Sequence, residues 1–508
     1  MLIRRVGVLV ALSISLAACS PQEVQPDSES APSVSSRTYV QRNTNAAPRV
    51  QSRYRSNYDE DSASQPRRQT QRARPNTHYA PVRNQAAAGR VATPTQLGSA
   101  GGDRTYRGQG ALTQLPDHIA GTLRARGFSE AGMGAYVRPA NGGAPILTAY
   151  ADTPRNPAST MKLVTTYSAL GVLGPDYRWP TELYISGPIN GGTLQGDVTI
   201  KGYGNPDFRE RDLRQLVQAL RARGIRHIAG NFVIDTTYFN IGYSAPIDGN
   251  TGAAYNAQPE ALLYNERGSC YTVRGKGNQV QRVCSSLPRS PADLNANLFG
   301  DFWRMWNGEM GGTMEGSLHV GSVPGGSQLI QTHYSNPLRD VIVEINKDSN
   351  NVMARQLLLS MGAKQFGAPG NTQKGAQAVG QFLESRGLRF GNLRIENGSG
   401  LSRIERISAR EMGEMLVDAY NSPYRSDLIR SMGVIGVDGT VKNRLRNLAG
   451  RGSFKTGTLR DVRALAGYLT AANGQPYVIS IIHNDGNIRG DAKQAHDQLV
   501  EWVYTGGR

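Results

Sequence analysis

The stretch "NPASTMKLVTTYSAL", residues 156–170, sets a serine and a lysine at the start of an apolar helix. The helix opens near Ser159, and Lys162 follows one turn later among apolar neighbours. Residues three apart share a helix face, so the Lys162 amine can reach the Ser159 hydroxyl. A lysine can deprotonate a serine when burial or a nearby cation disfavours its charged form. The stretch therefore predicts a nucleophile and its general base; a helix-capping serine beside an extended lysine is the structural alternative.

A second motif, "KTGT", covers residues 455–458 and is typical of a strand. It carries a lysine, two hydroxyls and a glycine that lets another backbone approach closely. Such a strand suits a substrate carboxylate, and its lysine brings a second positive charge that would disfavour the ammonium form of Lys162. Lys455 is predicted to be a catalytic residue, and Thr456, Gly457 and Thr458 are predicted to bind the substrate. An ordinary β-hairpin is the alternative.

A third motif, "KDSNN", opens the apolar helix that continues as "VMARQLLL". Ser349 is placed to relay a proton to a leaving amine, and Asn351 to hold a substrate amide. Serine and asparagine are also common helix N-caps, which is the structural alternative.

The order of the three motifs is far more specific than any one of them, and it resembles penicillin-binding proteins and class A β-lactamases. More of the chain is similar to the low-molecular-mass D-alanyl-D-alanine carboxypeptidase/endopeptidases of the penicillin-binding protein 4 type. The resemblance runs from about residue 110 to the C-terminus. The matching stretches are "NPASTMKLVTT", "GYGNPDF", "GNFVIDTTYF", "EINKDSNNVMARQLL", "ENGSGLSR", "GVDGTV" and "SFKTGTLRDVRALAGYL".

The resemblance implies a serine hydrolase that acts on peptidoglycan stem peptides and is covalently inhibited by β-lactams. Ser159 would attack the carbonyl between two D-alanines, or between D-alanine and a cross-linking diamino acid, with Lys162 as the base. Ser349 would pass the proton to the leaving nitrogen, and Asn351 would position Lys162 and the substrate amide.

The same resemblance assigns the substrate's two ends. Lys455, Thr456 and Thr458 would bind the terminal carboxylate. Asp235, in "VIDTTYF", would contact the amine of the diamino acid. No cofactor or metal is implied.

The expected fold is of the α/β (α+β) class: a serine β-lactamase/transpeptidase-like domain with an antiparallel sheet and helices, split by a strand-rich insertion. The catalytic domain would comprise residues 109–180 and 330–508, and the insertion residues 181–329. Near its start, "GMGAYVRPANG" and "PILTAYAD" predict two strands joined by a turn at residues 141–143.

Residues 1–18 are typical of a signal peptide, with two arginines before an apolar run too short to span a bilayer. "LAAC", residues 16–19, resembles the lipobox of bacterial lipoproteins, which implies acylation of Cys19 and attachment to a membrane. An ordinary secretory peptide is the alternative. Residue 20 is serine rather than aspartate, which in Gram-negative lipoproteins implies the outer membrane, facing the periplasm.

Residues 19–108 predict a disordered tether rich in arginine, glutamine, serine and proline. Between residues 20 and 110 the chain has 13 arginines, no lysine and seven acids, a net charge of +6. Such a segment cannot bury enough apolar surface to offset its ordering entropy. It would either lie along an anionic polymer or serve only as a solvated linker.

Two further cysteines, Cys270 and Cys284, close a loop of 15 residues. In an oxidising compartment they predict a disulfide, worth about 3 kcal/mol by loop-closure entropy. Two thiols without nearby histidines do not make a tetrahedral metal site. The whole chain carries +17, but no nucleic-acid recognition motif accompanies this charge, and no nucleic-acid partner is expected.

Two other functions remain open from the residues. A serine β-lactamase shares the three motifs, and "YSN" at residues 334–336 mimics the tyrosine motif of one β-lactamase class. That triplet lies just before a predicted helix, and we interpret it as structural. A non-catalytic, lipid-anchored peptidoglycan-binding protein is the other alternative. Protein partners are not predicted.

Overall fold

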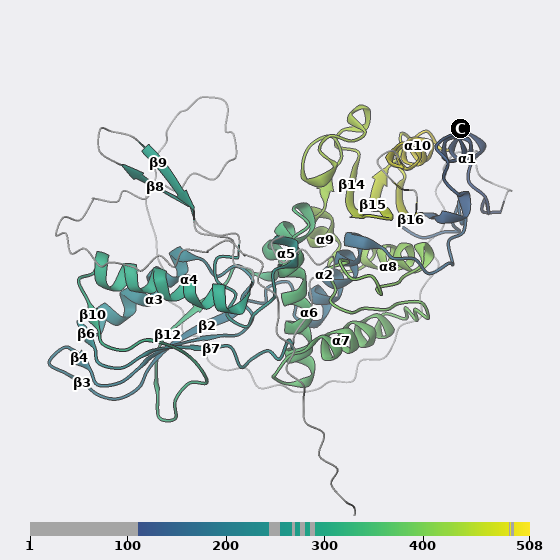
Figure 1. Cartoon of the computed structure of the whole chain (residues 1–508). Coiled ribbons are helices and arrows are strands. Elements are labelled where there is room, and N and C mark those ends of the chain that lie inside the picture. Colours follow the sequence, from purple (N-terminus) through teal and green to yellow (C-terminus); the bar gives the residue numbers. More distant parts are fainter. Residues whose placement is uncertain are drawn as a thin grey trace, which may run out of the picture. The chain divides into compact units, whose positions relative to one another are not determined.

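The computed structural model describes residues 110–242, 254–266, 270–274, 280–284, 290–486, 488 and 492–507, with the backbone alone for the two short ranges 270–274 and 280–284 (Figure 1). The expected signal peptide, Cys19 and the tether (1–18 and 19–108) lie outside the described residues. Within the described ranges, no helix combines the length and the apolar character needed to cross a bilayer.

A five-stranded antiparallel sheet forms the centre of the part that carries the three motifs. Its strands, in spatial order, are β1 (Met133–Pro139), β16 (Pro476–Asn484), β15 (Val462–Thr470), β14 (Gly452–Leu459) and β13 (Gly433–Val434). The central strands β15 and β16 are buried along nearly their whole length, which explains their continuous apolar runs "RALAGYL" and "YVISII".

Helices cover both faces of this sheet, and successive residues of a strand serve opposite faces. The helices are α1 (Asp117–Ala125), α2 (Met161–Val172), α5 (Leu338–Lys347), α6 (Asn351–Phe366), α7 (Thr372–Ser385), α8 (Ala409–Tyr420), α9 (Arg425–Ser431) and α10 (Lys493–Tyr504). On β16, Val478 and Ile482 pack into one core with α2, α5, α6, α7 and α8, whereas Ile479 and Ile481 pack into a second core with α1 and α10. Figure 1 shows α1 and α10 side by side.

Residues 180–334 contain a separate core built on a mixed five-stranded sheet. Its order is β11 (Leu318–Val320), β7 (Phe232–Asp235), β5 (Val198–Gly202), β2 (Pro180–Ile185) and β12 (Gln328–Tyr334). Helices α3 (Glu210–Ala222) and α4 (Pro291–Trp303) supply apolar side chains to this core. A small second sheet consists of β10 (Thr313–Met314), β6 (His227–Ile228), β4 (Thr193–Leu194) and β3 (Ile189–Asn190).

Strands β8 (Cys270–Arg274) and β9 (Val280–Cys284) form an antiparallel pair. Cys270 stands directly opposite Cys284 in its register. Residues opposite each other in an antiparallel pair have Cα atoms about 4.5–5.5 Å apart, which lies within the Cα range that a disulfide allows. The disulfide itself remains a prediction, because the side chains of these strands lie outside the described part.

The helix expected near Ser159 is present: it starts as a 3₁₀ turn, η2 (Ala158–Thr160), and continues as an α-helix from Met161. Another local feature differs from the sequence-based expectation. The second strand expected in "PILTAYAD" is reduced to isolated bridges from Leu147 to Val137 and Leu112. Tyr150, in the same stretch, has a left-handed backbone (φ 46°), which is incompatible with a continuing strand.

Candidate active site

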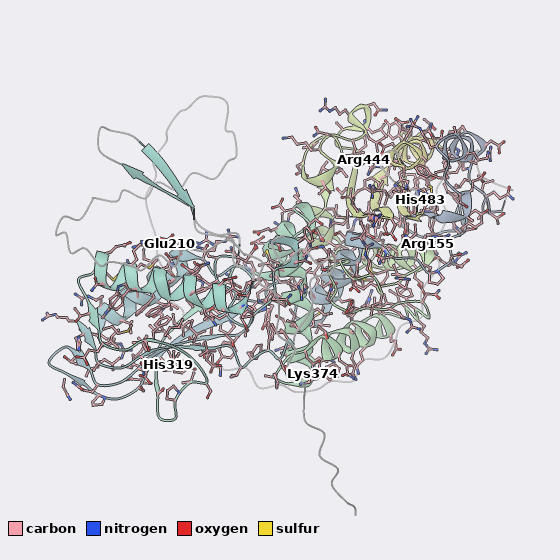
Figure 2. The ribbon with its side chains drawn as sticks, in the orientation of Figure 1. Arg155, Glu210, His319, Lys374, Arg444 and His483 are labelled. Atoms are coloured by element: carbon pink, nitrogen blue, oxygen red, sulfur yellow. The ribbon has the colours of Figure 1, made fainter. Side chains whose placement is uncertain are left out.

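The segment before the candidate nucleophile is fixed by buried polar groups. The Arg155 guanidinium donates to four backbone carbonyls, those of residues 131, 132, 150 and 153. Figure 2 shows Arg155 in the same part of the molecule as His483 on β16. Next along the chain, the Asn156 side chain accepts from the Ala158 N–H at 2.9 Å and donates to the Ser402 carbonyl at 2.8 Å. These contacts hold the turn that presents Ser159.

The turn at Ser159 has a strained backbone. Ala158 has φ 46°, a left-handed conformation that alanine rarely adopts. Gly400 packs directly against this turn, because a Cβ added there would lie 1.8 Å from the Ala158 carbonyl oxygen and 2.7 Å from the Ser159 nitrogen. Strain of this kind is common at catalytic residues. The half-buried Ser159 side chain therefore projects from a turn that its surroundings hold in place.

Lys162 is fully buried, and its amine has three oxygen neighbours. Nζ lies 3.1 Å from Ser159 Oγ and 2.6 Å from Asn351 Oδ1, and it also donates to the Ser399 carbonyl. The amide and carbonyl oxygens can only accept hydrogen bonds. A neutral amine therefore directs its two N–H groups to them and turns its lone pair to Ser159. In this arrangement a neutral Lys162 could accept the serine proton.

The electrostatic environment favours that neutral amine. Burial lowers the pKa of Lys162 well below its usual value, the nearby positive charge of Lys455 lowers it further, and the Glu405 carboxylate opposes the fall. Burial also lowers the pKa of Lys455, to about 7. Two buried lysines thus share one site, and the charge of Lys455 disfavours the charged form of Lys162.

Lys455 joins the second motif to the third. Its Nζ donates to Ser349 Oγ at 2.8 Å and to the Thr456 carbonyl at 3.0 Å. Ser349 lies between α5 and α6 with φ 58°, and Asn351 is the first residue of α6. The N-cap of α6 is Asn350, whose side chain accepts from the Met353 N–H. Ser349 and Asn351 are therefore not the capping residue, and both contact a buried lysine.

Strand β14 packs against the turn that carries Ser159. A Cβ at Gly457 would lie 2.6 Å from the Pro157 carbonyl oxygen and 3.1 Å from the Ala158 Cβ, so only glycine allows this approach. The exposed Thr458 follows it at the surface. Thr456 lies 2.8 Å, oxygen to oxygen, from the hydroxyl of Thr440, which belongs to the "GVDGTV" stretch. The structure thus brings Thr456, Gly457 and Thr458 to the same place as Ser159.

Three contributors to this site were missed by the sequence reasoning. Ser399 acts through its backbone carbonyl, Glu405 through buried charge, and Thr440 through its contact with Thr456. Lys347 and Asp438 form an ion pair at 2.5 Å that ties the "KDSNN" and "GVDGTV" stretches together. "ENGSGLSR" and "GVDGTV" were recognised only as similar stretches, and no residue in them was given a role.

Asp235 occupies a different setting, at the end of β7. Its carboxylate accepts from the Thr237 N–H and hydroxyl and from the Val323 N–H, and it pairs with Lys201 at 3.2 Å. Burial would raise the pKa of Asp235, but these hydrogen bonds and Lys201 together lower it. Within the described residues, the hydrogen bonds and the ion pair of Asp235 named above do not connect it to the Ser159 group. Its contact with substrate remains a prediction.

The "YSN" triplet is tied into the fold. Ser335 Oγ accepts from the Trp179 N–H at 3.0 Å and donates to the Asn336 carbonyl, while the Asn336 amide donates to Asp207. These contacts agree with a structural interpretation of the triplet. Across the described ranges, no cluster of three metal-binding side chains is present.

The geometry would suit serine acyl transfer with a lysine as the base, and comparison with known proteins places the chain in a family. The D-Ala-D-Ala carboxypeptidase 3 (S13) family matches residues 116–289 and 271–505, and the chain belongs to this family. The family predicted from the order of the motifs is therefore confirmed.

Relatives of known sequence and structure agree. The chain is 28% identical over 440 residues to a D-alanyl-D-alanine carboxypeptidase of Actinomadura sp. (strain R39), covering 73% of this chain and 81% of the relative. It is 26% identical over 377 residues to the D-alanyl-D-alanine carboxypeptidase DacB of Haemophilus influenzae, covering 63% and 78%. The crystal structure of penicillin binding protein 4 (dacB) from H. influenzae superposes with a TM-score of 0.62 at 24% identity, over 73% of this chain and 96% of that one. This likeness confirms the predicted fold class.

Proposed function

We propose that the protein is a serine D-alanyl-D-alanine carboxypeptidase/endopeptidase that acts on peptidoglycan stem peptides and is acylated by β-lactams. The observation that carries the proposal is the buried Lys162 amine, 3.1 Å from Ser159 Oγ, with two obligate acceptors for its protons. Membership of the S13 family and the similarity to D-alanyl-D-alanine carboxypeptidases support the substrate class.

The reaction would begin with proton transfer from Ser159 to Lys162 as Oγ attacks the carbonyl carbon of the scissile amide. The backbone N–H groups of Ser159 and Thr458 would stabilise the resulting oxyanion. The C–N bond then breaks, and the leaving nitrogen takes a proton from Ser349, whose hydroxyl Lys455 holds at 2.8 Å. The proton that Lys162 took from Ser159 is returned to Ser349, which leaves Lys162 neutral for the next step. Water hydrolyses the ester and regenerates Ser159.

The substrate's terminal carboxylate would lie against β14, where Lys455 supplies charge and Thr456 and Thr458 supply hydroxyls. Asn351, already bonded to Lys162, would use its remaining amide group to hold the substrate backbone. Asp235 would meet the amine of the diamino acid only if that amine replaced or joined Lys201 on its carboxylate.

Covalent labelling tests the assignment directly. Labelled penicillin should form a lasting adduct with the wild-type protein, and Ser159→Ala should form none while unfolding at an unchanged temperature. Labelling that persisted at another residue would refute the assignment. Rapid turnover of penicillin would favour the β-lactamase alternative, and a wild-type protein that never labels would favour a non-catalytic peptidoglycan binder. Digestion of cross-linked and uncross-linked muropeptides would then separate endopeptidase from carboxypeptidase activity.

We also propose that the enzyme is exported and held at the outer membrane, facing the periplasm, through lipidated Cys19. Support comes from the lipobox-like "LAAC" and from the composition of residues 19–108. As the predicted disordered tether, these roughly 90 residues would span about 50 Å root-mean-square, which would set the reach toward the cell wall. The test is to delete the tether while keeping Cys19. Activity on small soluble peptides should be unchanged and processing of intact wall should fall; equal wall processing would contradict the reach argument.

A further inference from the structure

Glu405 is a fully buried carboxylate beside the proposed active site. Its Oε1 accepts the backbone N–H groups of Glu396, Asn397 and Gly398 at 3.3, 3.1 and 2.8 Å. Its Oε2 is buried without a hydrogen-bond partner in the part of the chain that the structure describes. An incompletely satisfied buried carboxylate is costly to fold, so it requires an explanation beyond packing.

The backbone that Glu405 holds leads directly to Lys162. Asn397 Oδ1 accepts from the N–H of Ser399 at 3.0 Å and from its hydroxyl at 2.7 Å. Thr165, on α2, donates to the Gly398 carbonyl at 2.6 Å. The next carbonyl, that of Ser399, accepts a hydrogen bond from Lys162 Nζ. Glu405 therefore fixes a short chain of contacts that ends on the proposed base.

Charged groups from three elements surround Glu405 and Lys162. Lys162 comes from α2, Arg355 from α6 and Lys455 from β14, while Glu396 lies on the same loop as the N–H donors. Arg355 interacts with both Glu396 and Glu405, and its guanidinium also donates to the Ala257 carbonyl at 3.0 Å. Lys455 lowers the pKa of Lys162, whereas Glu405 raises it. Glu405 is thus the buried acid that opposes the effect of the second lysine.

We propose that Glu405 is a positioning residue for the general base: it holds the Ser399 carbonyl against Lys162 and supplies the negative charge that balances Lys455. This inference rests on the proposed function, because it assumes that Lys162 is the base. The carboxylate does not touch the reacting atoms. It directs the two amine protons away from Ser159 and keeps the amine basic enough to accept the serine proton.

The test compares Glu405→Gln with wild type, because glutamine keeps an oxygen for the three N–H groups and removes the charge. The matched control is Glu411→Gln. Glu411 also accepts backbone N–H groups, those of Asn392 and Ser408, but it has no described contact with Lys162. The rate of acylation by labelled penicillin is measured against pH. A nearby charge changes a pKa by about one unit or more. We therefore expect the acid limb of the Glu405→Gln profile to move down by about one pH unit, and the Glu411→Gln profile to stay in place.

A second measurement does not depend on activity. The chain has nine lysines, so the titration of the Lys162 amine can be followed by NMR after selective ¹³C labelling of lysine, assigned by its loss in Lys162→Met. Glu405→Gln should lower that titration point by the same amount. If the titration moves while the protein fails to acylate, the positioning inference stands and the proposed function fails. An unchanged titration, or an equal change in the Glu411→Gln control, would overturn the inference even in an active enzyme.

Discussion

Gly457→Ala should disable the site by a simple steric effect. The backbone of Gly457 lies outside the left-handed region, so alanine is conformationally permitted there. Its methyl group, however, would lie 2.6 Å from the Pro157 carbonyl oxygen, whereas ordinary contacts begin at 3.4 Å. Strand β14 and the turn before Ser159 must therefore separate by about 0.8 Å, the difference between these two distances.

The expected cost follows from that displacement. Misplacing reacting groups by about 1 Å can cost about 10²-fold in rate, or about 2.7 kcal/mol of transition-state stabilisation. The hydroxyls proposed to bind the substrate carboxylate and the Thr458 N–H proposed for the oxyanion all lie on the displaced strand. The second-order rate of acylation by a fluorescent penicillin should therefore fall by about two orders of magnitude, while the serine and both lysines remain present.

Gly452→Ala provides the matched control. It lies on the same strand, and its methyl group would also clash, at 2.8 Å from the Tyr468 carbonyl oxygen, but it does not face the Ser159 turn. Both variants should lose thermal stability, and only Gly457→Ala should lose acylation disproportionately. Acylation of Gly457→Ala within about threefold of wild type would refute the claim that this contact sets the geometry of the site.

Three further predictions concern the base, the hairpin and a buried histidine. Lys162→Arg should abolish acylation almost as completely as Lys162→Ala, because arginine stays charged; substantial activity in the arginine variant would mean that Lys162 acts through charge alone. Cys270 and Cys284 should appear linked in a non-reduced peptide digest, and replacing both by serine should lower the unfolding free energy by about 3 kcal/mol; two free thiols in the oxidised protein would show the pairing wrong. Burial lowers the pKa of His483 to about 4. The neutral ring's contribution to the free energy of unfolding is therefore complete above about pH 6.5 and is lost as the pH falls through 4. Urea unfolding should show about 3 kcal/mol less acid destabilisation between pH 7 and pH 4 in His483→Leu than in wild type; equal destabilisation in both proteins would exclude His483 as a source.

The sequence predicted the family and the fold class because catalytic motifs impose local spacing. Ser159 and Lys162 share one helical turn, and Ser349 and Asn351 flank one helix start. Such spacings can be read without coordinates, and their order along the chain is specific.

The remaining parts of the site leave no such pattern. The Ser399 contact to Lys162 uses a backbone carbonyl, which any residue could supply. Glu405 is recognisable only once its burial is known. The left-handed backbone of Ala158 is not a local preference of alanine, and it packs against Gly400, which lies 242 positions later in the sequence. Tertiary contacts of this kind override local propensity, and they decide the final geometry.

The two buried lysines also affect how variants of this protein should be screened. With its pKa at about 7, Lys455 costs roughly 4 kcal/mol of unfolding free energy at neutral pH, because the unfolded chain binds that proton far more readily. Lys455→Met would remove this penalty together with the charge proposed to bind the substrate carboxylate. A melting-temperature screen would then rank a chain with a crippled site above the working protein. Heat resistance alone is therefore a misleading criterion for selecting improved or better-expressed forms.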